Sequence, residues 1–149
     1  MERLPEHGPC FVCGTENPSS MGFVFYHEGS RLVAEGTLTR AQQGPPGHAH
    51  GGSLAAILDE AMGWVLWRNG YKVVAAHLEF DYRHPTPLDV PLRVEAQLGE
   101  KGNRSIRTSA QLLLPDGTVT VEGRGVFVEL GDEFVRRFGD FWGAPPVEE

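Results

Sequence analysis

One long apolar run, Leu54 to Arg68, limits the folds open to this chain more than any other feature. The run has helical spacing, Ser53 before it is a plausible N-cap, and Asn69-Gly70 after it is a good C-terminal signal. It is apolar on nearly every side, whereas a surface helix pairs an apolar stripe with a polar face. We therefore expect one helix at the centre of the fold, wrapped by the rest of the chain.

Runs typical of β-strands lie on both sides of that helix. Two precede it and four follow it, with Pro115-Asp116-Gly117 as a tight turn before the last strand. This order predicts an α+β fold in which a curved antiparallel sheet wraps around the helix. A short helix is expected after the last strand. The expected strands span residues 21–26, 31–39, 73–82, 90–98, 104–114 and 118–130, and the terminal helix spans 132–142.

Length and charge exclude several classes of protein. The 149 residues suit one domain, and the formal net charge of −7 argues against nucleic-acid binding, which depends on neutralising phosphates. No stretch approaches the roughly 20 apolar residues of a membrane-spanning helix. Met1 to Gly8 lack the basic start and apolar run of a secretory signal. We expect a soluble cytoplasmic protein with no membrane partner.

His50-Gly51-Gly52 stands where a Gly/Pro-rich loop meets the expected helix. Glycine lets the backbone approach a ligand closely, and the first N–H groups of a helix lack partners inside it. Such donors suit an anion or an oxygen that gains negative charge during a reaction. An equally simple interpretation is that Gly51 and Gly52 only allow the loop to turn sharply.

Asp59 lies two turns into the apolar helix, where an unpaired carboxylate is costly. Burial would raise its pKa toward the range of a general base. Its neighbour Glu60 competes for this role, because adjacent helical residues point about 100° apart and only one of the two need face a pocket. The simpler interpretation of either acid is an ion pair, with Arg68, Arg83 or another arginine as its partner.

Gly51 and Asp59 cannot meet within one chain if both lie on one helix. Seven or eight residues of helix separate them by about 11 Å. If both act on one substrate, a second copy of the chain must supply one of them. The spacing therefore predicts a homodimer with shared sites, with a tetramer as a further alternative.

The segment from His50 to Ala61, HGGSLAAILDEA, closely resembles the signature of hotdog-fold thioesterases. The phenylacetate-pathway and 4-hydroxybenzoyl-CoA types carry HGG and then an acid nine residues after the histidine. The resemblance extends from about Met21 to Leu130 and includes the strand end Tyr82-Arg83-His84-Pro85. It implies a hotdog domain over 23–130, a Cys/Pro/Gly-rich extension over 1–22 and a tail over 131–149.

The resemblance also implies an activity, the hydrolysis of acyl-CoA thioesters, with no metal or redox cofactor. In the family the N–H of the first glycine polarises the thioester carbonyl, which falls on Gly51. The helix acid of the neighbouring subunit acts as base or nucleophile, which falls on Asp59. An Asn or Gln often stands six residues before the motif histidine. Here Gly44 is there and Gln43 precedes it, so Gln43 is the candidate helper.

Further residues are candidates for shaping the site or holding the substrate. His50 is expected to shape the loop rather than transfer protons. Gly52 joins Gly51 in admitting the substrate, and His77 either completes the shared site or is an ordinary sheet histidine. Arg83 and Arg104 are candidates for the phosphates of coenzyme A. Gly63, where relatives sometimes have Thr, removes one hydroxyl near Asp59.

Cys10 and Cys13 form a single C-x-x-C pair before any expected helix. A structural zinc site takes four ligands, and only His7 and His27 are possible helpers in this part of the sequence. A thioredoxin-like role expects the pair at the start of a helix. Two thiols packed in a tight turn is the preferred interpretation, and a metal completed by His7 or by another chain is the alternative.

Two other functions stay open at this point. The same fold also serves as a non-catalytic module that binds or senses acyl-CoA, because fold does not determine activity. A dehydratase or hydratase of acyl thioesters is the other alternative. It is disfavoured because the expected helix has two acids, Asp59 and Glu60, but no histidine beside them.

Overall fold

The computed structural model describes residues 1–5 and 8–138, and its centre is the helix α1 (Gly51–Arg68). The helix begins three residues earlier than expected, and its N-cap is His50, not Ser53. His50 has extended φ and ψ of −66° and 135°, and its ring nitrogen Nδ1 accepts a hydrogen bond from the Gly52 N–H at 2.9 Å. Ser53 lies inside the first turn, where its N–H donates to the His50 carbonyl.

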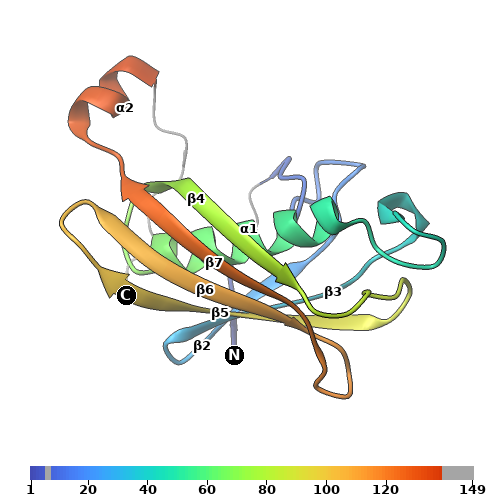
Figure 1. The fold of residues 1–149 in the computed structure, drawn as a ribbon. Coiled ribbons are helices and arrows are strands. Elements are labelled where there is room, and N and C mark those ends of the chain that lie inside the picture. The colour runs from blue at the N-terminus through green and yellow to red at the C-terminus, as the bar shows by residue number, and fades with distance from the viewer. Residues whose placement is uncertain (6–7, 139–149) are drawn as a thin grey trace.

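A single antiparallel sheet curves around α1, as Figure 1 shows. This confirms the predicted α+β hotdog architecture. Within the described residues the strand order is β1-β2-β3-β5-β6-β7-β4, which places β1 and β4 at the two edges. The strands are β1 (Glu2–Arg3), β2 (Val24–Glu28), β3 (Arg31–Thr37), β4 (Val73–Tyr82), β5 (Pro91–Lys101), β6 (Ser105–Leu113) and β7 (Val119–Glu129).

Side chains of α1 fill the concave face of the sheet. Trp64 stacks on Phe25 of β2 with ring centroids 6.1 Å apart, and it meets Trp67 edge-on at 4.6 Å. A Cβ added to Gly123 of β7 would lie 3.4 Å from Leu58 and 3.2 Å from Phe80 of β4. The helix therefore runs close beneath β7 and β4, which explains why an all-round apolar run is stable there.

The N-terminal segment is part of the same core. Val12, Cys13 and Met21 are buried, and the N–H groups of Met21 and Phe23 donate to the carbonyls of Phe11 and Val12. Strand β1, which the sequence pattern did not predict, pairs with β2. The expected boundaries at 1–22, 23–130 and 131–149 stay predictions.

The short helix α2 (Asp132–Phe138) follows β7, and the expected residues 139–142 lie outside the described part. A 3-10 turn, η1 (Arg40–Gln42), begins the loop that leads to α1. No helix among the described residues is both long and apolar enough to cross a membrane.

Candidate functional site

At the start of α1 the backbone N–H of Gly51 differs from its neighbours in its hydrogen bonding. Gly52 donates to the His50 ring, and Ser53 and Leu54 donate to the His50 carbonyl. The His50 N–H is itself bound to the Gln42 carbonyl at 2.7 Å. For the Gly51 N–H, residues 1–5 and 8–138 provide no acceptor. This N–H lies at the positive end of the helix dipole, where a ligand oxygen is stabilised.

The loop before the helix accounts for Gln43 and Gly44. The side-chain oxygen of Gln43 accepts a hydrogen bond from the Gly47 N–H at 2.9 Å, and Gln43 is exposed. A Cβ at Gly44 would lie 2.8 Å from the Cα of His50, so the loop packs directly on the motif histidine. An Asn or Gln does not fit at position 44 without moving the loop, which gives a physical reason for the departure from the family pattern.

Tyr82, at the end of β4, is a site residue to which the sequence pattern assigned no role. Its hydroxyl donates to the Gly51 carbonyl at 2.8 Å. Its ring covers Gly51, since an added Cβ there would lie 3.4 Å from the ring. Partial burial raises the pKa of the Tyr82 hydroxyl, so it stays protonated and keeps its donor. A contact between residues 31 apart carries no local sequence signal.

Asp59 is half-buried on α1. Burial first, and the nearby negative charge of Glu60 second, raise the pKa of its carboxyl. Across the described ranges its side chain makes no hydrogen bond or ion pair, so the expected partners Arg68 and Arg83 do not neutralise it. Eight helical residues place it about 12 Å along the axis from Gly51. Gly63, one turn later, is buried and offers no hydroxyl.

Glu60, the competing acid, has a different environment. Its Oε1 accepts a hydrogen bond from the indole N–H of Trp64 at 3.1 Å. The thiols of Cys10 and Cys13 lie 3.5 and 3.6 Å from the same oxygen. Glu60 is therefore bound to the N-terminal segment. The carboxylate of Asp59 has no such contact in the described part of the chain.

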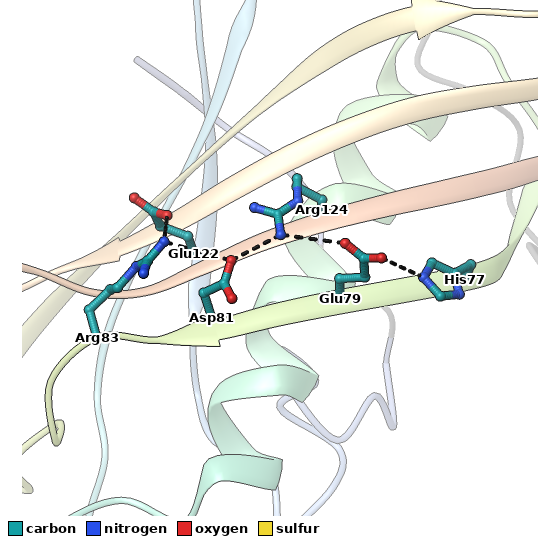
Figure 2. A network of polar contacts seen from close by, with 6 residues as sticks. All are labelled: His77, Glu79, Asp81, Arg83, Glu122 and Arg124. Carbon is teal, nitrogen blue, oxygen red and sulfur yellow. Dashed lines mark hydrogen bonds and ion pairs between the residues drawn. The ribbon is translucent and has the colours of Figure 1, made fainter.

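His77 and Arg83 lie in a charged network on the outer face of β4 and β7. His77 contacts Glu79 at 3.1 Å, and Arg83 contacts Glu122 at 3.1 Å. Leu78 and Phe80, which alternate with these residues, face α1, so the network faces away from the helix. Hydrogen bonds from His77 and then Arg124 lower the pKa of Glu79. Figure 2 shows the whole network: His77, Glu79, Asp81, Arg83, Glu122 and Arg124.

Arg104 lies at the opposite end of the sheet from Gly51. Its carbonyl accepts from the Glu129 N–H, and Glu129 pairs with Val73 at the first residue of β4. Gly51 contacts Tyr82 at the last residue of that strand, and nine strand steps span about 30 Å. Within one protomer the structure thus brings together His50, Gly51 and Gly52, with Gln43 in the same loop. It leaves Asp59 and Arg104 at a distance from them, and it turns His77 and Arg83 to the outer face of the sheet.

Known proteins are similar to this chain in sequence and in fold. The family model of the thioesterase superfamily matches residues 46–121, just over half of the 149-residue chain. Acyl-coenzyme A thioesterase THEM4 of Rattus norvegicus is 33% identical over 89 residues, covering 59% of this chain and 38% of that protein. The chain spans about two fifths of the length of this relative and of its Xenopus laevis counterpart.

Solved structures support the fold. Protein RHA08564, a thioesterase superfamily protein, is 36% identical with a TM-score of 0.76, covering 78% of this chain and 61% of its own. PaaI of E. coli is 20% identical with a TM-score of 0.70, over 74% and 81% of the two chains. A hypothetical thioesterase protein from Streptococcus pneumoniae, solved with coenzyme A, is 17% identical with a TM-score of 0.69, over 73% and 86% of the two chains. This chain therefore belongs to the thioesterase superfamily and has its hotdog fold.

Proposed function

We propose that the chain hydrolyses acyl-CoA thioesters to a free acid and coenzyme A. One observation carries the proposal: the same helix presents, in the described part of the chain, a half-buried carboxylate without a cation and a first-turn N–H without an acceptor. The names of the relatives, acyl-coenzyme A thioesterases, support the substrate class. The coenzyme A bound to the Streptococcus pneumoniae protein supports it as well.

The reaction follows from these two groups. The thioester carbonyl oxygen accepts a hydrogen bond from the Gly51 N–H, which stabilises the negative charge that develops there. Asp59 of the partner subunit takes a proton from water, the resulting hydroxide adds to the carbonyl carbon, and the C–S bond breaks. The proton then passes to the departing sulfur. In the alternative route the Asp59 carboxylate attacks the carbonyl carbon, the C–S bond breaks and releases the thiolate, and water then hydrolyses the mixed anhydride to the free acid and the Asp59 carboxylate. Neither route needs a metal or a redox cofactor.

Three other residues near the helix start support the loop and the Gly51 backbone. His50 holds the loop through Gly52, Gln43 braces the turn at Gly47, and Tyr82 holds the Gly51 carbonyl. These contacts keep the one donor of Gly51 aimed at the substrate, and preset donors are what accelerates acyl transfer. Location in the cytoplasm stays a prediction.

We propose that the dimer required by the shared site forms through β4. β4 pairs with β7 on one side, and no described strand pairs with its other side. A ten-residue open edge is a template for a second copy. Antiparallel pairing would place Val73 of the partner subunit beside Tyr82 and bring the partner's Arg104 toward the helix start. Arg104 and Arg83 are then the candidates for coenzyme A phosphates, and His77 lies on the joined edge.

The first test measures free thiol release from a panel of acyl-CoAs that differ in length and aromaticity. The wild type is expected to turn over at least one of them, and Asp59→Asn to lose turnover while still binding. A wild type that binds acyl-CoA without any turnover would make the chain a binding module instead.

The second test mixes two inactive variants, Asp59→Asn and Gly51→Pro, under conditions that exchange subunits. In a mixed dimer with shared sites, one site has both native residues, so random mixing restores about a quarter of wild-type activity. If each site lies within one chain, mixing restores nothing. Light scattering of the wild type decides between dimer and tetramer.

A further inference from the structure

Three metal-ligating side chains meet between the N-terminal segment and α1. The two sulfurs and a carboxylate oxygen of Cys10, Cys13 and Glu60 all lie within 4.8 Å of one another. Cys13 is buried, and Cys10 and Glu60 are half-buried. Sequence spacing showed only the C-x-x-C pair, because the third member comes from the helix about 50 residues later.

The two sulfur–oxygen distances are those of a tetrahedral zinc site. Zinc binds sulfur at about 2.3 Å and carboxylate oxygen at about 2.0 Å. With tetrahedral angles at the metal, the ligand sulfur and the ligand oxygen therefore lie about 3.5 Å apart. In the structure Glu60 Oε1 lies 3.5 Å from the Cys10 sulfur and 3.6 Å from the Cys13 sulfur. A thiol–carboxylate hydrogen bond has a similar length, so the experiment below must separate the two.

The turn that carries Cys10 and Cys13 places both sulfurs near the same oxygen of Glu60. The Gly14 N–H donates to the Cys10 carbonyl at 2.9 Å, and the Val12 N–H donates to the Cys10 sulfur at 3.4 Å. A Cβ at Gly14 would lie 2.0 Å from the Gly8 carbonyl oxygen, so only glycine closes this turn. An N–H that donates to sulfur stabilises the thiolate, the form that binds metal.

Glu60 is fixed by a hydrogen bond from Trp64, in the way that outer residues fix the ligands of a metal site. The Trp64 indole N–H donates to its Oε1 at 3.1 Å, and Trp64 is itself buried between Phe25 and Trp67. Such outer hydrogen bonds orient carboxylate ligands in metal sites.

We propose that Cys10, Cys13 and Glu60 bind a structural zinc ion that joins the N-terminal segment to α1. The fourth position belongs to water or to a further side chain. His27 is not part of the cluster formed by the described residues, and His7 lies outside them. Binding releases the two thiol protons to solvent, so affinity falls in acid. The ion holds the residue next to Asp59 and takes no part in hydrolysis, so the proposal stands apart from the catalytic one.

The test measures the zinc content of the purified full chain by mass spectrometry of the elements, without chelators. The wild type is expected to hold about one zinc ion per chain. The Cys10→Ser/Cys13→Ser double variant is expected to hold almost none. Glu60→Gln should weaken zinc affinity at least about tenfold in a chelator competition, since even an outer partner is worth that much. Asp59→Asn, the matched control one residue away, should keep the wild-type content.

Replacement with Co²⁺ keeps the test decisive if a variant does not fold. The wild type is expected to show thiolate-to-cobalt charge-transfer absorption and the visible bands of tetrahedral cobalt. A wild type that takes up neither zinc nor cobalt would overturn the proposal, as would cysteines found joined in a disulfide. Glu60→Gln with undiminished affinity would also overturn it, because the carboxylate would then not be a ligand.

Discussion

The outer face of β4 and the helix α1 hold their polar groups in opposite situations. On β4, His77, Glu79 and Asp81 are exposed, or nearly so: His77 contacts Glu79, and both acids pair with Arg124, as Figure 2 shows. On α1, within the described ranges, Asp59 and the Gly51 N–H have no protein partner although both residues are partly buried. Exposed ion pairs contribute little, whereas partly buried groups without partners are costly and cluster where chemistry is done.

The largest effect is expected at Asp59. Asp59→Asn keeps the size of the side chain but removes the carboxylate, so kcat should fall by about 10³-fold. The melting temperature should not fall, because the variant removes a negative charge whose burial is unfavourable. Thiol release and a melting curve check both. A variant that keeps most of its activity would show that the unpartnered acid is not the base or nucleophile.

Removing the Gly51 donor should have the next largest effect. Proline is favoured at the first helical position, and His50 already has the extended φ and ψ that precede proline. Gly51→Pro should therefore fold but lose about 10²-fold in kcat, because it deletes the N–H that polarises the thioester carbonyl.

Gly51→Ala is the matched control for that variant. It adds a Cβ at an ordinary 3.4 Å from the Tyr82 ring and keeps the N–H. It should retain most of the activity in the same thiol assay. Equal losses in the two variants would point to crowding under Tyr82 instead of a lost donor.

A smaller effect is expected at Tyr82, which links the two regions. Tyr82→Phe keeps the ring over Gly51 and removes the hydrogen bond to its carbonyl. Because the residue is half exposed, the lost hydrogen bond contributes about 0.5 kcal/mol. If all of this free energy positions Gly51 for the reaction, kcat should fall by about twofold. Kinetics at saturating substrate measure it. An unchanged kcat with a lowered melting temperature would make the contact purely structural.

The smallest effect is expected on the outer face. Glu79→Gln removes one exposed charge that contacts His77 and Arg124. Activity and melting temperature should stay close to wild type, and any change should shrink in high salt. A large loss of activity would show that Glu79 itself, and not only the neighbouring candidate Arg83, supports substrate binding, and it would break the contrast with α1.

The local pattern was sufficient for most of the secondary structure. The expected strand 73–82 matches β4 at both ends, and the turn at Pro115-Asp116-Gly117 is present, with Gly117 at a φ of +87°. These features depend on neighbours within a few residues, such as alternation along a strand or a glycine where φ is positive. The resemblance at His50 to Ala61 likewise located the motif, because it is one continuous segment.

What the pattern missed is set by contacts far apart in the chain. The helix starts at Gly51 because the His50 ring caps it and Gln42 holds the His50 N–H, neither of which a propensity for Ser at the cap reveals. A bulge between Ala75 and His77, seen only once β4 pairs with β7, interrupts the alternation along the strand. His77 lies beyond it, on the face away from α1.

By itself, then, the sequence determined one buried helix, the strands around it and the motif that names the family, because each is written in residues close together in the chain. Only the tertiary structure decided which of two adjacent acids is engaged. It set Glu60 against Cys10 and Cys13, and it left Asp59 without a partner in the described part. The physical reason is that neighbouring helical side chains point about 100° apart, and what each meets depends on which distant segment packs there.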